Sequence, residues 1–194
     1  PKPFAGKALA MIFEKPSTRT RVSFELGMKK LGGDAVVLER ESSQLGRGET
    51  VADTARVLSR YVDCIMVRTT KESKLMELAD NASVPVINLE TCFEHPCQAV
   101  ADVFTMRERL LSLKGRRLTL AWSVHPEPRP LGPTHSVLTL AAMMGMNVTL
   151  AHPLGFEVDD SVLANSKKLA DEAGGSVQIV NDLQAGARGA DVLY

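Results

Sequence analysis

Short apolar segments rich in β-branched residues alternate with amphipathic helical patterns along almost all of the 194 residues. The pattern predicts strands at Ala8–Phe13, Ala35–Leu38, Cys64–Val67, Val86–Asn88, Leu118–Trp122, Asn147–Ala151, Val177–Val180 and Asp191–Leu193. It predicts helices at Arg19–Leu31, Thr50–Tyr61, Glu72–Asn81, Pro96–Leu111, Thr134–Met144, Ser161–Ala173 and Leu183–Ala187. Such alternation is typical of parallel sheets that are covered by helices on both faces. We therefore predict an α/β fold with two doubly wound parallel-sheet domains, the second of them incomplete in this chain.

The polar segment 112–117 follows a long predicted helix and suggests a domain boundary. We expect a first domain at residues 1–111 and part of a second at residues 117–194. The chain starts almost on a strand and stops within one, so we also expect it to be a fragment of a longer protein. Parallel sheets of this kind bind ligands beyond the carboxyl ends of their strands, so the loops that follow strands are where a site is expected.

Composition excludes some classes of function. Lysine plus arginine and aspartate plus glutamate balance at 23 each, and aromatic content is only 5%, which does not favour a nucleic-acid-binding protein. No apolar run approaches the length of about eighteen residues that a membrane span needs, so we expect no membrane association. The three cysteines are odd in number and unevenly spaced, which predicts reduced thiols and a cytoplasmic location.

Two hydroxyl residues and an arginine, Ser17, Thr18 and Arg19, fall where the first predicted strand gives way to a helix. Unpaired backbone N–H groups and the positive end of the helix dipole favour an anion at such a turn. A charge-assisted hydrogen bond from an arginine to a phosphate contributes roughly 1.5–3 kcal/mol. The alternative is a plain helix cap with solvated arginines, but the density of donors favours a phosphate site.

Arg68 lies at the carboxyl end of another predicted strand. An arginine in this position is often a solvated side chain at a sheet edge. In a doubly wound sheet, however, Arg68 would face the same side as the turn at Ser17–Arg19. Two arginines that converge on one place are better explained by an anionic ligand.

His95 falls at the start of the helix predicted from Pro96. The helix dipole disfavours a second proton on its imidazole, and a neutral histidine can donate to a developing oxyanion. The alternative is a capping histidine followed by proline at the first helical position. His95 and Cys97 have no further cluster of ligands at metal-binding spacing, so no metal is expected.

The loop 122–131 follows a predicted strand, contains three prolines and carries His125. A rigid structural loop and a binding loop are both compatible with this composition. A dinucleotide-binding unit would show Gly-x-Gly-x-x-Gly here, and this sequence does not, so we expect neither a nicotinamide nor a flavin cofactor.

Several segments together resemble the aspartate and ornithine carbamoyltransferase family. The segment Phe13–Glu25 is similar to the family's carbamoyl-phosphate signature, and His95–Ala99 is similar to its second signature. Residues 43–49 and 53–61 resemble the ornithine branch, whereas the loop 122–131 resembles that of the N-acetylornithine and N-succinylornithine carbamoyltransferases. The two halves thus point to different acceptors.

The resemblance implies transfer of a carbamoyl group from carbamoyl phosphate to the side-chain amine of ornithine or an N-acylated ornithine, without metal or organic cofactor. It assigns the phosphate to Ser17, Thr18, Arg19 and Thr20, with Arg68 reaching both phosphate and carbonyl oxygen. His95 would donate to the carbonyl oxygen, and Gln98 would hold the carbamoyl amide.

Gln44 would reach the site of a neighbouring subunit, which implies a homo-oligomer, a trimer. Further candidates for contact with the acceptor are Trp122, His125 and Glu90. The competing hypothesis is a non-catalytic, anion-binding relative that acts as a regulatory or scaffold subunit. A scaffold has no need of Arg19, Arg68, His95 and Gln98 together, which disfavours it.

Overall fold

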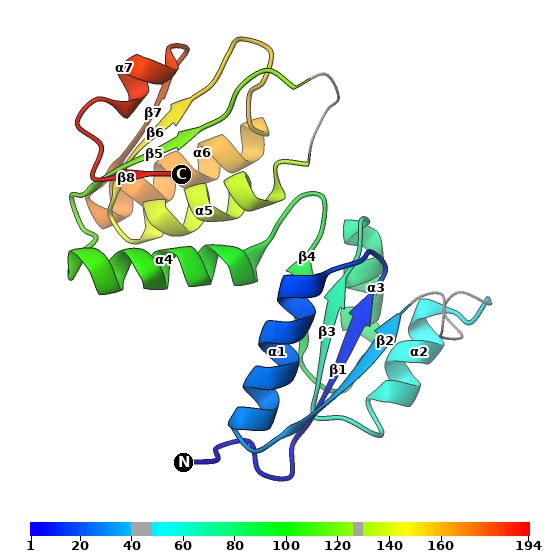
Figure 1. Ribbon diagram of the computed structural model, residues 1–194. Helices are drawn as coiled ribbons and strands as arrows, with labels where there is room; N and C mark the ends of the chain where they lie inside the picture. The colour runs from blue at the N-terminus through cyan, green and yellow to red at the C-terminus, as the bar shows by residue number, and fades with distance from the viewer. Residues whose placement is uncertain (40–47, 126–129) are drawn as a thin grey trace. The chain divides into compact units, whose positions relative to one another are not determined.

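The computed structural model describes residues 1–39, 48–125 and 130–194, and the chain forms two compact units, Pro1–Cys92 and Phe93–Tyr194 (Figure 1). The strands of the first unit are β1 (Ala8–Phe13), β2 (Asp34–Glu39), β3 (Cys64–Arg68) and β4 (Val86–Glu90). Its helices are α1 (Thr18–Lys30), α2 (Val51–Leu58) and α3 (Glu72–Asn81). The strands of the second unit are β5 (Arg117–Ala121), β6 (Asn147–Ala151), β7 (Ser176–Val180) and β8 (Val192–Leu193). Its helices are α4 (Pro96–Leu110), α5 (Gly132–Met143), α6 (Asp160–Ala173) and α7 (Leu183–Ala187).

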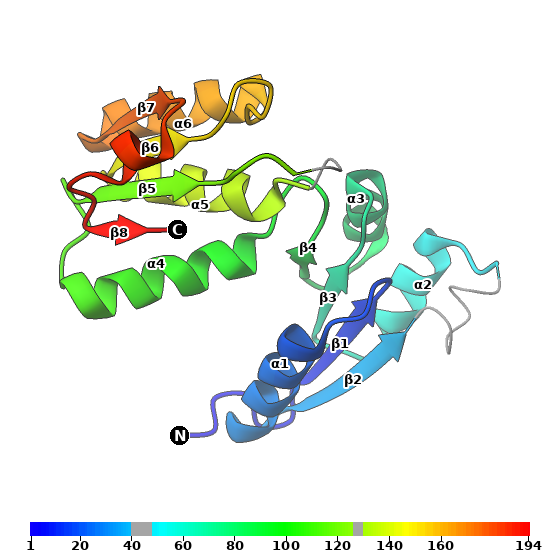
Figure 2. The same cartoon turned by 45° about the horizontal axis from the view of Figure 1, so that its top comes forward.

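The first unit is a parallel sheet with the strand order β2-β1-β3-β4. Successive side chains of a strand point to opposite faces. Ala10 and Ile12 of β1 therefore share a face with Ile65 of β3, and this face packs against Leu75 and Leu78 of α3 as well as against α2. Helix α1 lies on the other face of the sheet, as the two views agree (Figures 1 and 2).

The second unit is also a parallel sheet, with the order β7-β6-β5-β8. Leu120 and Leu150 belong to a core that includes Val137 and Leu138 of α5, and all four side chains are almost completely buried. Helix α7 covers the opposite face, where Thr119 Oγ1 donates a 2.7 Å hydrogen bond to the backbone carbonyl of Gly186.

The predicted fold class is confirmed, because both units are parallel sheets with helices on both faces. The compact units, however, divide before α4, whereas the sequence suggested a boundary after it. Ala99 and Met106 explain the difference, since both α4 side chains are buried in the same core as α5. The assignment of residues 1–111 and 117–194 to two functional domains stays a prediction.

The order of the strands reverses once in each sheet, between β1 and β3 in the first and between β5 and β8 in the second. Ligands of doubly wound sheets bind beyond the carboxyl ends of strands at such switch points. The loops after β1, β3 and β5 are therefore the places where site residues are expected.

Among the described residues, none of the helices is long and apolar enough to cross a membrane.

Replacing Thr119 with valine should lower the free energy of unfolding by about 1–3 kcal/mol, because the change leaves the buried Gly186 carbonyl without its donor. The paired residue on β6, Thr149, provides a matched control, since its hydroxyl only accepts from the exposed Gln178 amide. Thr149→Val should change stability by less than about 0.5 kcal/mol. Urea denaturation of both variants measures the difference, and equal losses would contradict the role given to Thr119.

Candidate functional site

The turn between β1 and α1 keeps its hydrogen-bond donors available. Ser17 occupies the N-cap position in an extended conformation, and its side chain makes no capping hydrogen bond. The first turn of α1 contains no acidic residue, so no carboxylate offsets the positive end of the helix dipole. A plain cap, the alternative considered from the sequence, therefore does not describe Ser17.

The two arginines of this turn have different surroundings. Arg21 forms an ion pair with Glu39 at 2.6 Å and a longer one with Glu25 at 3.8 Å. Arg19 is exposed, and within the part of the chain that the structure describes it has no carboxylate partner. Of the two arginines, the one that the sequence assigned to phosphate is thus the one without an ion pair among the described residues.

Arg68 lies at the end of β3, in register with Phe13 at the end of β1. Since β3 is an interior strand, Arg68 is not a solvated side chain at a sheet edge. Its guanidinium forms an ion pair with Glu90, at the end of β4, and only 17% of the side chain is exposed. Its Nε is buried and has no hydrogen-bond partner among the described residues, so one donor of Arg68 is still unused.

Glu14 ties the ends of β1 and β3 together. Its backbone N–H donates to the carbonyl of Arg68 at 3.0 Å. Its carboxylate accepts from the Thr69 hydroxyl and from the Lys74 ammonium, each at 2.5 Å, and only 13% of the side chain is exposed. This role of Glu14 was not predicted from the sequence. Its one signal there is an acidic residue directly after a buried strand, where a carboxylate needs a partner.

His95 occupies the N-cap position of α4, with Pro96 in the first turn, and the first turn again has no acidic residue. The residue is only 9% exposed, and its backbone N–H donates to the Ser136 hydroxyl at 2.8 Å. Gln98 is exposed, and its Nε2 donates to Asp102 Oδ1 at 2.8 Å. Because a carboxylate only accepts, this bond fixes the amide with Oε1 as the end that can accept from another donor.

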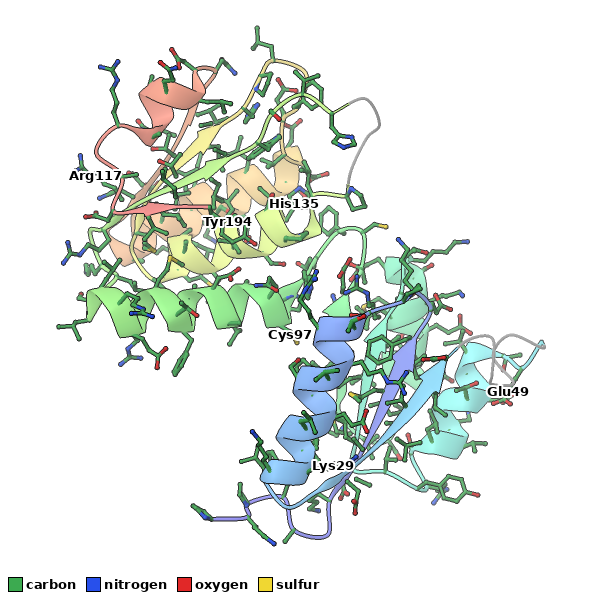
Figure 3. All side chains as sticks on the ribbon, viewed as in Figure 1. Lys29, Glu49, Cys97, Arg117, His135 and Tyr194 are labelled. Atoms are coloured by element: carbon green, nitrogen blue, oxygen red, sulfur yellow. The ribbon has the colours of Figure 1, made fainter. Side chains whose placement is uncertain are left out.

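Asp102 also faces the end of β8. Burial, followed by the negative charge of Asp102, raises the pKa of Tyr194 to about 12. Figure 3 labels Tyr194 above α4. Gln98, Asp102 and Tyr194 therefore form a polar group that includes the carboxyl end of β8, a strand of the switch point.

Trp122 is held by the loop that follows β6. Its indole stacks on His152 with ring centroids 4.8 Å apart, and its Nε1 donates to the Phe156 carbonyl at 3.0 Å. His152 is only 1% exposed. These contacts show that Trp122 packs against its own unit, which favours a rigid structural loop over a binding loop at this residue. His125, further along the loop, is half-buried.

The three residues expected to contact the acceptor fall in different units. Glu90 belongs to the first unit, where it pairs with Arg68, whereas Trp122 and His125 belong to the second. Gln44 lies outside the described residues. Among residues 1–39, 48–125 and 130–194, no three His, Cys, Asp or Glu side chains come together as metal ligands.

Burial raises the pKa of the Cys64 and Cys97 thiols. Both therefore hold their protons more firmly than an ordinary cysteine, and neither has the properties of an activated nucleophile. Cys97 lies in the first turn of α4 (Figure 3).

Two family models match the chain. The carbamoyl-P binding domain of aspartate/ornithine carbamoyltransferase matches residues 1–108, and the Asp/Orn binding domain of the same family matches residues 133–194. The chain belongs to the aspartate/ornithine carbamoyltransferase family. The predicted resemblance is thus confirmed.

Relatives in this family are similar over nearly the whole chain. Ornithine carbamoyltransferase of Anoxybacillus flavithermus is 47% identical over 99% of the chain and 59% of its own length. That of Methanothermobacter thermautotrophicus is 48% identical over 97% of the chain and 60% of its own length. The chain therefore spans about 60% of the length of these carbamoyltransferases.

Solved carbamoyltransferase structures share the fold of the entire chain. Ornithine carbamoyltransferase from Pyrococcus furiosus has a TM-score of 0.90 and 44% identity, and the match covers 100% of the chain and 60% of that structure. An acetylornithine transcarbamylase complexed with acetylcitrulline has a TM-score of 0.91 and 38% identity, covering 100% of the chain and 65% of that structure.

Replacing Glu14 with glutamine should lower the free energy of unfolding by about 1 kcal/mol, because the partly buried pair with Lys74 loses its charge. Glu25→Gln is the matched control, since Glu25 pairs with two exposed side chains of α1, Lys29 and, at longer distance, Arg21. It should cost less than about 0.5 kcal/mol. Chemical denaturation measures the free energy of unfolding of both variants. A Glu14 variant as stable as the control would contradict the proposal that Glu14 holds the ends of β1 and β3 together.

Proposed function

We propose that the protein containing this chain transfers the carbamoyl group of carbamoyl phosphate to the side-chain amine of ornithine or of an N-acylated ornithine. The observation that carries this proposal is the start of α1, where neither a capping side chain nor an acidic residue offsets the backbone donors and the helix dipole. This turn lies in the region that matches the family's carbamoyl-P binding domain. An anion is the ligand that such a turn favours.

The first unit supplies the groups for the phosphate. In this proposal Ser17, Thr18 and Thr20 donate to the phosphate oxygens, and Arg19 contributes its positive charge. Arg68 uses its remaining donor on the ligand while its pair with Glu90 holds the guanidinium in place. Cationic and dipolar groups of this kind stabilise the charge that accumulates on a departing phosphate.

The second unit supplies the groups for the carbamoyl end. His95 donates to the carbonyl oxygen, and Oε1 of Gln98 accepts from the carbamoyl amide. The uncharged amine attacks the carbamoyl carbon, and the carbonyl oxygen gains negative charge in the tetrahedral intermediate. The bond from carbon to the phosphate oxygen then breaks, phosphate leaves with the electron pair, and it takes up the proton that the amine nitrogen loses.

The proposed acceptor is ornithine or an N-acylated ornithine, without a choice between them. The first half resembles ornithine carbamoyltransferases, and relatives at 47–48% identity carry that name. The loop after β5 resembles the acylated branch, and acetylornithine transcarbamylases are among the similar structures. We further propose a trimeric assembly in which Gln44 reaches the site of a neighbouring subunit, a cytoplasmic location, and a reaction without metal or organic cofactor. The non-catalytic alternative finds no support among these relatives.

The proposed reaction is tested by giving the full-length protein carbamoyl phosphate with ornithine, N-acetylornithine, N-succinylornithine or aspartate in separate assays. We expect a carbamoylated product with one of the three ornithine-type acceptors and none with aspartate. Mass spectrometry of the product and phosphate release measure the outcome. No product with any acceptor would overturn the proposed function.

Arg19→Ala should weaken the affinity for carbamoyl phosphate by at least ~100-fold, because it removes a bidentate, charge-assisted contact. Arg21→Ala is the matched control, two residues away on the same helix, since Arg21 is already paired with Glu39. The control should stay within about threefold of the unmodified affinity. Isothermal titration calorimetry with carbamoyl phosphate measures both, and unchanged affinity in Arg19→Ala would refute the assignment of this turn.

A further inference from the structure

The segment that leads into α4 is held to the start of α5 by two neighbouring side chains. Ser136 accepts from the backbone N–H of His95 at 2.8 Å. His135 makes a 3.0 Å hydrogen bond through Nδ1 with the backbone carbonyl of Phe93. The rings of His135 and Phe93 also meet edge to face, with centroids 5.1 Å apart. Consecutive residues of one helix turn thus hold both ends of the segment Phe93–His95.

The hydrogen bonds of His135 identify its tautomer. A carbonyl oxygen only accepts, so Nδ1 carries the proton that bonds Phe93. Nε2 accepts from the backbone N–H of Asp159 at 3.4 Å, which requires that nitrogen to be unprotonated. His135 is 6% exposed, and in this geometry its Nδ1 is the donor and its Nε2 the acceptor.

Helix α5 is a rigid support for these two contacts. Val137 and Leu138, which follow directly, are completely buried in the core of the second unit. Figure 3 labels His135 at the end of α5 nearest the loop that enters α4. His95 itself has a non-helical backbone, with φ −139° and ψ 67°, so the helix geometry of α4 alone does not set its orientation. Groups held from a packed element keep a functional side chain in place.

We propose that Ser136 and His135 are positioning residues that fix the backbone at His95 and so direct its imidazole to the carbonyl oxygen of carbamoyl phosphate. This inference rests on the proposed function. It predicts an effect on the chemical step rather than on phosphate binding, because the phosphate is assigned to groups of the first unit. A purely structural role would lower stability and leave kcat per folded molecule unchanged.

Ser136→Ala in the full-length protein should lower kcat by ~10-fold, with KM for carbamoyl phosphate changed by less than about threefold. Ser136→Thr retains the hydroxyl and should recover most of the lost rate. Met143→Ala, at the exposed far end of the same helix, should match the unmodified enzyme. Wild-type kcat in Ser136→Ala, or a loss in Ser136→Thr as large as in Ser136→Ala, would overturn the assignment.

His135 provides a second test that does not depend on activity. Nitrogen-15 spectra of the labelled full-length protein at neutral pH should show a protonated Nδ1 and an unprotonated Nε2 for His135, assigned by its loss in His135→Asn. The opposite tautomer would refute the geometry, even if Ser136→Ala failed to fold. His135→Asn, which can still donate to the Phe93 carbonyl, should retain more kcat than His135→Ala, and equal losses would contradict the role of that bond.

The two proposals fail in different ways. An unmodified protein that carbamoylates none of the acceptors overturns the proposed function. An active protein whose Ser136→Ala variant keeps full kcat overturns the positioning role alone.

Discussion

The parallel pairing of β1 with β3 is the constraint on which the first unit depends. This pairing sets Phe13 opposite Arg68, so the turn into α1 and the end of β3 lie side by side at the carboxyl ends of the strands. Strand β2 lies on the other side of β1, so the strand order reverses between β1 and β3. The hydrogen bonds of Glu14 to Arg68, Thr69 and Lys74 then keep the two strand ends from separating. A register shift by one residue would turn Arg68 to the opposite face.

The helices of the chain differ in the electrostatics of their N-termini. Helices α2, α3 and α6 each carry an acidic residue in the first turn, which offsets the positive end of the dipole. Helices α1, α4 and α5 carry none, and in none of the three does the N-cap side chain make a capping hydrogen bond. Stability alone would favour a cap and an acid at all three places. At α1 and α4, which begin in segments similar to the family signatures, their absence is expected if an anionic ligand supplies the missing charge.

Much of this arrangement could be predicted from the sequence, because it depends on local patterns. The strands Ala8–Phe13 and Asn147–Ala151 and the helix Glu72–Asn81 have the bounds that periodicity indicated. The long-range contacts could not be predicted in the same way. Glu14 and Lys74 are 60 residues apart, and no local pattern pairs them. The placement of α4 in the second unit likewise depends on contacts of Ala99 and Met106 with a core formed later in the chain.

The same distinction explains why His95 was identified and its supports were not. A histidine before proline at a helix start is visible in the sequence, whereas Ser136 lies 41 residues further along and is joined to His95 only by the fold. A buried backbone N–H must find a partner, and here a side chain of α5 supplies it. Helix α5 begins at Gly132, directly after the segment 122–131 in the sequence, and its first turns hold the His95 segment through Ser136. Substitutions that shift the start of α5 would therefore displace His95 from the carbonyl oxygen in the proposed reaction, although the substituted residues contact no ligand.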